Sequence, residues 1–206
     1  MRVALVGGTG SFGRALAVRL REAGLDVVLG SRSAERAGEA AAELGVEGAT
    51  NEDAARGADL VVLATRAEAM VETAAELADA IGDTPVLSVG AELRFTKGGV
   101  LPSPEATSLA ERIAERVRAP VVAGLHSLAA SNLGGEEAPE EDTLVCGDDP
   151  EAKALVLDLA ARLVRGRAVD AGPLASARAL EGLTAVIVNV NKRYRAHAGV
   201  RVTGLP

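Results

Sequence analysis

Aromatic side chains are nearly absent from this chain of 206 residues, which has two Phe, one Tyr and no Trp. Its core must therefore consist of Ala, Val and Leu, and a hydrophobic content of 48% is typical of a globular protein. So few aromatic rings argue against binding nucleic acid by base stacking. Basic residues are also in deficit, giving a net charge of -7. Because this sign disfavours a phosphate backbone, we expect no nucleic-acid partner.

Cysteine occurs once, as Cys146 in the apolar run DTLVCGDD. One cysteine excludes an internal disulfide, and a free Cys is usually buried and inert. The chain shows no signal-peptide pattern, and its apolar runs are shorter than the ~18 residues of a membrane span. We therefore expect a cytoplasmic protein with no membrane partner. The motif G-x-S-x-G and His-rich metal spacing are absent too, so hydrolysis is unsupported and we expect no metal.

Apolar strand patterns alternate with amphipathic helix patterns over about the first 125 residues. This alternation is typical of βαβ units on a parallel sheet with right-handed crossovers. We expect strands at residues 2–7, 25–31, 46–50, 59–65, 84–90 and 119–125, and helices at residues 11–23, 34–44, 51–58, 67–81 and 105–117. Residues 91–104 contain Gly and Pro and are expected to form a long loop.

The rest of the chain begins with a polar loop, whose acidic run at residues 136–142 we expect to be solvated. Strand patterns at 143–147 and 166–172 and helices at 150–163 and 174–194 follow. We therefore predict an α/β fold of the doubly wound, mostly parallel type in residues 1–135. Residues 136–206 are expected to form a small C-terminal α/β extension packed on it.

The first twenty residues, MRVALVGGTGSFGRALAVRL, place a glycine motif between a strand and a helix. Gly8, Gly10 and Gly13 match G-x-G-x-x-G, the fingerprint of dinucleotide-binding (Rossmann) folds. The first glycine makes the turn, the second admits a pyrophosphate, and the third lets helix and strand pack closely. The N–H groups at the start of the helix then face the phosphates.

The end of the second strand, LGSRSAERA, indicates which dinucleotide binds. NAD-binding chains usually carry Asp or Glu there, about twenty residues beyond the glycines. Here Ser31 and Arg32 stand in that place and no acid is present. A guanidinium at Arg32 grips a 2′-phosphate that a carboxylate would repel, and Arg36 adds charge one helical turn later. We therefore expect NADP rather than NAD.

Two further sites follow strands at the edge where ligands of open α/β sheets bind. Thr65 and Arg66 lie at the carboxyl end of the strand at 59–65, and Arg66 either contacts the cofactor or points into solvent. His126, in AGLHSLAASN, follows the strand at 119–125 and is either a structural residue or a contact near the nicotinamide. The basic tail from Lys192 to Arg201, which contains His197, serves either an anionic ligand or interhelical and intersubunit pairing.

Several stretches together resemble the NADPH-dependent coenzyme F420 reductases, also called F420:NADP oxidoreductases. They are the glycine motif, VVLGSR, HSLAA, VCGDDPEAKALVLDLA, and the more specific DAGPL and NKRYRAHAG. The resemblance covers nearly the whole chain. It implies a small Rossmann domain with a compact C-terminal extension, usually a homodimer. It also implies an oxidoreductase that transfers a hydride between NADP(H) and the deazaflavin ring of coenzyme F420.

The resemblance also implies roles for individual residues. His126, Ser127 and Leu128 would face the deazaflavin, with His126 the one possible catalytic residue. The chain departs from the family pattern at TRAEAM, SVGAEL and Ala129, where a proline is common. Cofactor-binding positions, some already reached from the glycine motif and strand ends, are Gly8, Thr9, Gly10, Ser11, Phe12, Gly13, Ser31, Arg32, Arg36, Thr65, Arg66, Ala67, Val71 and Ala130.

Two other functions fit parts of the same pattern. One is an NADP-dependent reductase of a small imine or keto substrate, built like pyrroline-carboxylate reductases. Those enzymes need a larger helical C-terminal domain than the stretch of roughly sixty residues after Cys146 provides. The other is a non-catalytic NADP-sensing module that acts through a partner protein, for which the apolar stretch LTAVIVNV would supply an interface.

Overall fold

The computed structural model describes residues 1–205, and across that range one sheet contains eight strands. The strand order is β10-β9-β8-β5-β4-β1-β2-β3. Crossovers on either side of β1 place helices on both faces of the sheet, as in a doubly wound α/β fold. The strands are β1 (Arg2–Val6), β2 (Asp26–Ser31), β3 (Glu47–Thr50), β4 (Leu60–Leu63), β5 (Val86–Ser88), β8 (Val121–Gly124), β9 (Thr143–Gly147) and β10 (Ala168–Asp170).

Pairing in this sheet is parallel except between β8 and β9, within residues 1–205. The central strands are buried on both faces, which explains their continuous Val and Leu runs. Strands β9 and β10 extend the same sheet beyond β8. The mostly parallel α/β fold expected from the sequence is confirmed, whereas the division of the chain at residue 135 stays a prediction.

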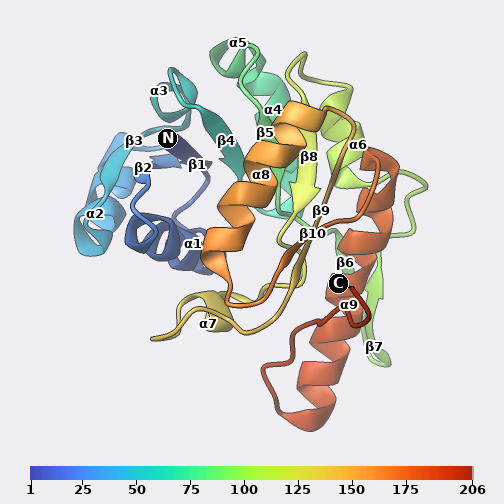
Figure 1. The fold of residues 1–206 in the computed structure, drawn as a ribbon. Helices are drawn as coiled ribbons and strands as arrows, with labels where there is room; N and C mark the ends of the chain where they lie inside the picture. Colours follow the sequence, from blue (N-terminus) through green and yellow to red (C-terminus); the bar gives the residue numbers. More distant parts are fainter. Residues whose placement is uncertain (206) are drawn as a thin grey trace.

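Helices cover the two faces with separate apolar clusters. One cluster joins the sheet to α1 (Ser11–Glu22), α2 (Ala34–Leu44), α7 (Ala130–Leu133) and α8 (Pro150–Leu163). The other joins it to α3 (Asn51–Ala55), α4 (Ala67–Glu76), α5 (Ala78–Ile81), α6 (Leu109–Ala114) and α9 (Ala177–Tyr194), which a 3₁₀ turn at Leu174–Ser176 precedes. In Figure 1, α9 runs down one side of the molecule and extends past the sheet. No helix within residues 1–205 is long and apolar enough to span a bilayer.

Local sequence signals account for several helix ends. Ser33 caps α2 by accepting a hydrogen bond from the Arg36 backbone, and Gly45 ends the helix in the left-handed conformation. Ser108 caps α6 with a reciprocal capping box, so this helix begins later than the expected helix at 105–117. Asp149 caps α8 ahead of a proline in the first turn.

Two expected elements differ from the structure. The loop expected at 91–104 contains an antiparallel hairpin, β6 (Leu93–Thr96) and β7 (Gly99–Pro102). The side chain of Asn189 on α9 bonds both the N–H and the C=O of Val100, at 2.8 and 2.7 Å. This contact between distant segments stabilises the hairpin. The sequence of residues 91–104 alone does not reveal it. The single helix expected at 67–81 is interrupted at Leu77, which separates α4 from α5 and packs into the core.

Candidate functional site

The glycine turn between β1 and α1 is sterically required at two of its three motif positions. A Cβ on Gly8 would lie 2.9 Å from the Leu5 backbone oxygen. A Cβ on Gly13 would lie 2.5 Å from both the Cα and the backbone oxygen of Gly8. Gly10 differs, because a Cβ there would meet no protein atom within 4 Å. The first and third glycines therefore pack the turn, and the second leaves open space above the helix.

The start of α1 presents backbone donors to that space. Gly10 is the N-cap of α1 and provides no side-chain cap, and the first turn of the helix contains no acidic residue. The N–H groups of this turn are therefore free to bind an anion, and the helix dipole favours negative charge there.

A cavity of about 520 Å³ opens beside this turn, at the carboxyl edge of the sheet. Gly10 and Thr9 border it on one side, and residues from the ends of β2 and β4 border it on others. Expected cofactor residues that line it are Thr9, Gly10, Ser31, Arg32, Arg36, Thr65 and Arg66. The structure thus brings together residues that lie up to 57 positions apart in the sequence, from Thr9 to Arg66.

Arg32, Arg36 and Arg66 give this cavity its positive charge. Among the ion pairs within residues 1–205, none involves these three side chains. Because no carboxylate among the described residues forms an ion pair with them, their guanidinium groups remain available for a ligand phosphate.

Two polar side chains in the cavity have local features that also suit a ligand. The Thr65 hydroxyl is buried and has no hydrogen-bond partner among the described residues. Asn51, the first residue of α3, is buried and accepts a 3.0 Å hydrogen bond from the Gly7 N–H through its Oδ1. The sequence reading missed Asn51 because helix-start signals alone do not show that its side chain reaches the glycine turn.

Five other expected cofactor positions do not line the cavity. Phe12, Ala67 and Val71 are partly buried and pack against the two apolar clusters. Ser11 is exposed at the first position of α1, and Ala130 is the first residue of α7. Their cofactor contacts stay predictions.

The expected deazaflavin residues His126, Ser127 and Leu128 are all buried, with exposed fractions of 6%, 3% and 5%. The Ser127 hydroxyl donates to the Asp142 carbonyl, 3.3 Å away. These three residues thus pack into the protein and offer little surface to a ligand, and their contact with a deazaflavin stays a prediction. Leu125, just before them, has a positive φ of 65°, a strained conformation for a non-glycine residue.

His126 links the loop after β8 to the loop after β5. Its Nε2 lies 3.0 Å from the Gly90 carbonyl, and burial lowers its pKa to about 4. The ring is therefore neutral near pH 7, so Nε2–H donates to Gly90 and Nδ1 carries the lone pair. Nδ1 is buried without a partner among residues 1–205. The arrangement suits a residue that holds two loops together rather than a proton donor.

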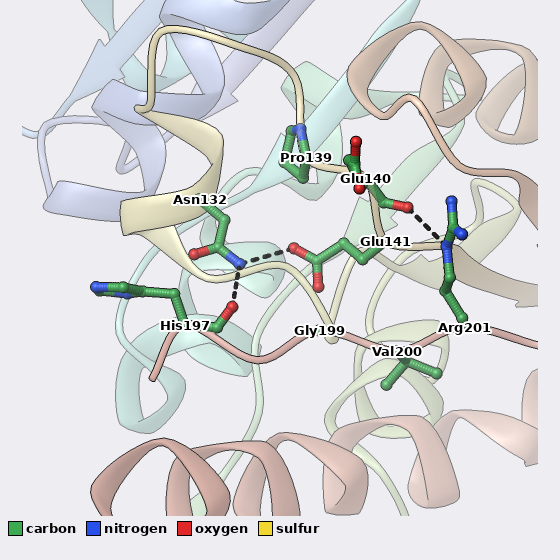
Figure 2. Close-up of a pocket in the computed structure, with 8 residues that line it drawn as sticks. All are labelled: Asn132, Pro139, Glu140, Glu141, His197, Gly199, Val200 and Arg201. Carbon is green, nitrogen blue, oxygen red and sulfur yellow. Dashed lines mark hydrogen bonds between the residues drawn. The ribbon is translucent and has the colours of Figure 1, made fainter. Parts of the chain in front are cut away.

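A second cavity, of about 430 Å³, lies between α7 and the C-terminal tail. Figure 2 shows Asn132 pointing toward Glu141, with the tail passing beneath them. The Asn132 amide donates to Glu141 at 3.0 Å, and Arg201 donates to the Glu140 carbonyl at 3.1 Å. Part of the basic tail is thus bonded to the acidic loop and is not a free cationic groove.

The acidic run at 136–142 is not fully solvated, contrary to the expectation from its charge. Glu141 and Asp142 are only 7% and 2% exposed. Backbone N–H groups of Val202 and Arg167 bond Asp142 and lower its pKa to about 2. Burial raises the pKa of Glu141 instead. These two carboxylates fasten the C-terminal tail to the sheet, a contact that local charge patterning does not show.

A doubly wound sheet, an open glycine turn at a helix N-terminus and unpaired arginines beside it define a dinucleotide-binding protein of the Rossmann class. A sequence profile described as NADP oxidoreductase coenzyme F420-dependent matches residues 2–92.

Curated relatives extend this similarity over the whole chain. An F420-dependent NADP reductase of Methanothermobacter thermautotrophicus is 34% identical over 223 aligned positions, covering 100% of this chain and 96% of that protein. One from Methanocaldococcus jannaschii is 33% identical, covering 100% of this chain and 99% of that protein. This chain belongs to the family of F420-dependent NADP reductases.

Solved structures agree with the fold. A crystal structure provisionally assigned as an F420-dependent NADP reductase, from Arthrobacter sp. FB24, has a TM-score of 0.87 at 26% identity and covers 99% of this chain and 100% of that one. A pyrroline-5-carboxylate reductase from Coxiella burnetii has a TM-score of 0.67 at 17% identity. The match covers 94% of this chain but 65% of that reductase, and it shows likeness of fold alone.

The different surroundings of Gly10 and Gly13 predict different effects of the same substitution. Gly13→Ala should lower the free energy of unfolding by about 1–3 kcal/mol, because the added methyl group overlaps the Gly8 backbone. Gly10→Ala should leave stability within about 1 kcal/mol of the wild type but weaken NADPH binding roughly tenfold or more, because the methyl group fills the approach of the pyrophosphate. Urea unfolding and calorimetric titration measure the two effects. Equal effects of both variants on stability would contradict this assignment.

Proposed function

We propose that this protein is an oxidoreductase that transfers a hydride between NADP(H) and coenzyme F420. The observation that carries the proposal is the open turn at Gly10 facing a cavity with three unpaired arginines. Full-length similarity to curated F420-dependent NADP reductases supports the second substrate.

The glycine turn and β2 hold NADP(H) in this proposal. Backbone N–H groups at the start of α1 bind the pyrophosphate, and Arg32 with Arg36 binds the 2′-phosphate. Ser31 and Thr9 border the same space, and the unpartnered Thr65 hydroxyl donates to a ribose or phosphate oxygen. The residues present therefore fit a phosphorylated dinucleotide.

Bound nicotinamide supplies the hydride chemistry, and the protein contributes position and electrostatics. His126 holds the loops after β5 and β8 at a set separation through its bond to Gly90. Because its pKa is about 4, it does not serve as a proton donor at neutral pH. The Leu128 N–H already donates to the Leu125 carbonyl at 3.0 Å, so the other backbone N–H groups of residues 126–130 would stabilise negative charge that develops on the deazaflavin.

Turnover tests the reaction directly. Mixing the purified protein with NADPH and oxidised coenzyme F420 should bleach the deazaflavin absorbance, and the reverse mixture should form NADPH. Binding of NADPH without turnover of any acceptor would favour an NADP-sensing module instead. Turnover of small imines or ketones alone would favour the other rival reductase, although this chain lacks about a third of the length of the pyrroline-carboxylate reductase it resembles in fold.

Arg32 should determine the preference for the phosphorylated cofactor. Arg32→Ala should raise the KM for NADPH about tenfold or more, since it removes a charge-assisted contact, and should change the KM for NADH about twofold or less. Steady-state kinetics with both cofactors measure this difference. An equal rise of both KM values would remove the 2′-phosphate role.

We further propose a cytoplasmic homodimer that uses the exposed apolar face of α9. Val186, Val190 and Tyr194 follow one another at four-residue spacing and are 56%, 36% and 71% exposed. Phe95 and Leu101 of the hairpin that packs on α9 are 69% and 42% exposed. An exposed apolar patch of this kind is typical of a protein–protein interface. Because the family resemblance implies a homodimer, we propose that a second copy of this chain covers it.

Sedimentation tests the dimer. The wild type should sediment as a dimer, and Val186→Asp should sediment as a folded monomer, because a charge in the centre of an apolar interface is costly to desolvate. Circular dichroism of the variant serves as the folding control. A wild-type protein that remains monomeric at high concentration would contradict the proposal.

A further inference from the structure

One wall of the cofactor cavity is acidic. Four α4 residues line the cavity, Ala69, Glu72, Thr73 and Glu76, and their spacing of three and four residues places them on one helix face. The opposite face carries Met70 and Ala74, which are fully buried in the core. Glu72 and Glu76 line the cavity and form no ion pair within the described residues, so their carboxylates keep free acceptor positions.

The two phosphate positions decide which part of the cofactor meets this wall. The pyrophosphate belongs at Gly10 and the 2′-phosphate at Arg32, and in NADP(H) both are attached to the ribose that carries adenine. With those two points occupied, the base on the same ribose is left with the remainder of the cavity. That remainder is bounded by the α4 face, by Asn51 and by the residues after β4, which include Thr65 and Arg66.

The α4 face and Asn51 offer complementary hydrogen-bonding groups. Glu72 and Glu76 can only accept when ionised. Asn51 is 8% exposed and uses its Oδ1 for the Gly7 N–H, so its amide nitrogen, which makes no hydrogen bond within residues 1–205, is left to donate. Adenine presents a donor, its exocyclic 6-amino group, and acceptors, its ring nitrogens. The arrangement is complementary when the 6-amino group faces the carboxylates of Glu72 and Glu76 and the ring nitrogens face the amide nitrogen of Asn51.

The two carboxylates of the acidic wall repel the phosphate groups of the cofactor. Two carboxylates beside a ligand with several phosphate charges weaken its binding unless a hydrogen-bond donor of the ligand reaches them. We propose that Glu72 and Glu76 recognise the 6-amino group of adenine and thereby make the protein selective for adenine among purine dinucleotides. The proposal rests on the placement of NADP(H) in this cavity, and it adds base recognition to that placement.

Comparison of NADPH with its hypoxanthine analogue, in which oxygen replaces the 6-amino group, tests the inference. Titrations followed by nicotinamide fluorescence give both dissociation constants without the second substrate. The wild type should bind NADPH about five- to tenfold more tightly than the analogue, as expected for one hydrogen bond at a partly exposed site. The double variant Glu72→Gln with Glu76→Gln should bind both within about twofold, because a carboxamide donates as well as accepts.

Glu68→Gln is the matched control, because Glu68 is an exposed acid of the same helix that does not line the cavity. It should retain the wild-type ratio of dissociation constants, although the loss of charge shifts both constants together. Equal binding of the two dinucleotides by the wild type would overturn the inference while the NADP site stands. A loss of selectivity in Glu68→Gln as large as in the double variant would overturn it too. Failure of the wild type to bind NADPH would overturn the proposed function itself.

Discussion

The contact between Gly8 and Gly13 is the constraint on which the rest of the site depends. A side chain at Gly13 would overlap the Gly8 backbone and push α1 away from the turn. A side chain at Gly8 would overlap Leu5 of β1 and Leu29 of β2. The close approach of the two glycines aims the N-terminus of α1 at the carboxyl edge of the sheet, where the ends of β2 and β4 lie on either side of β1. Arginines from those neighbouring strands thus come to face the same cavity as the helix N–H groups.

Sequence patterns predicted those elements whose structure depends on residues close together in the chain. The G-x-G-x-x-G spacing predicted the turn, and the apolar runs predicted the parallel strands, because each depends on residues adjacent in sequence. The cavity positions of Arg32 and Thr65 followed from the rule that ligands bind at carboxyl ends of parallel strands. Structure was needed for Asn51 and the α4 face, since their relation to the cavity depends on packing between separate elements.

The sequence-based predictions for the hairpin β6–β7 and for the buried acids were wrong for the same reason. Gly and Pro in residues 91–104 indicate a loop, yet one amide of α9 bonds both polar groups of Val100. Charge in residues 136–142 indicates solvent, yet Asp142 meets backbone donors from two distant segments. In both cases a long-range hydrogen bond outweighs a weak local preference, as expected where burial leaves a polar group only one good partner.

The distribution of charge explains how an acidic protein binds an anionic cofactor. The net charge of -7 produces a repulsive average field, but binding responds to the groups within a few ångströms. Half of the arginines outside the cavity are paired with acids within the described residues, as Arg2, Arg56 and Arg165 are, so their charge is locally cancelled. Arg32, Arg36 and Arg66 form no ion pair in the described part of the chain and outnumber the two carboxylates that line the same cavity, so the cavity attracts phosphate against the overall field. Charge at the cavity rather than total charge decides which ligand this fold accepts.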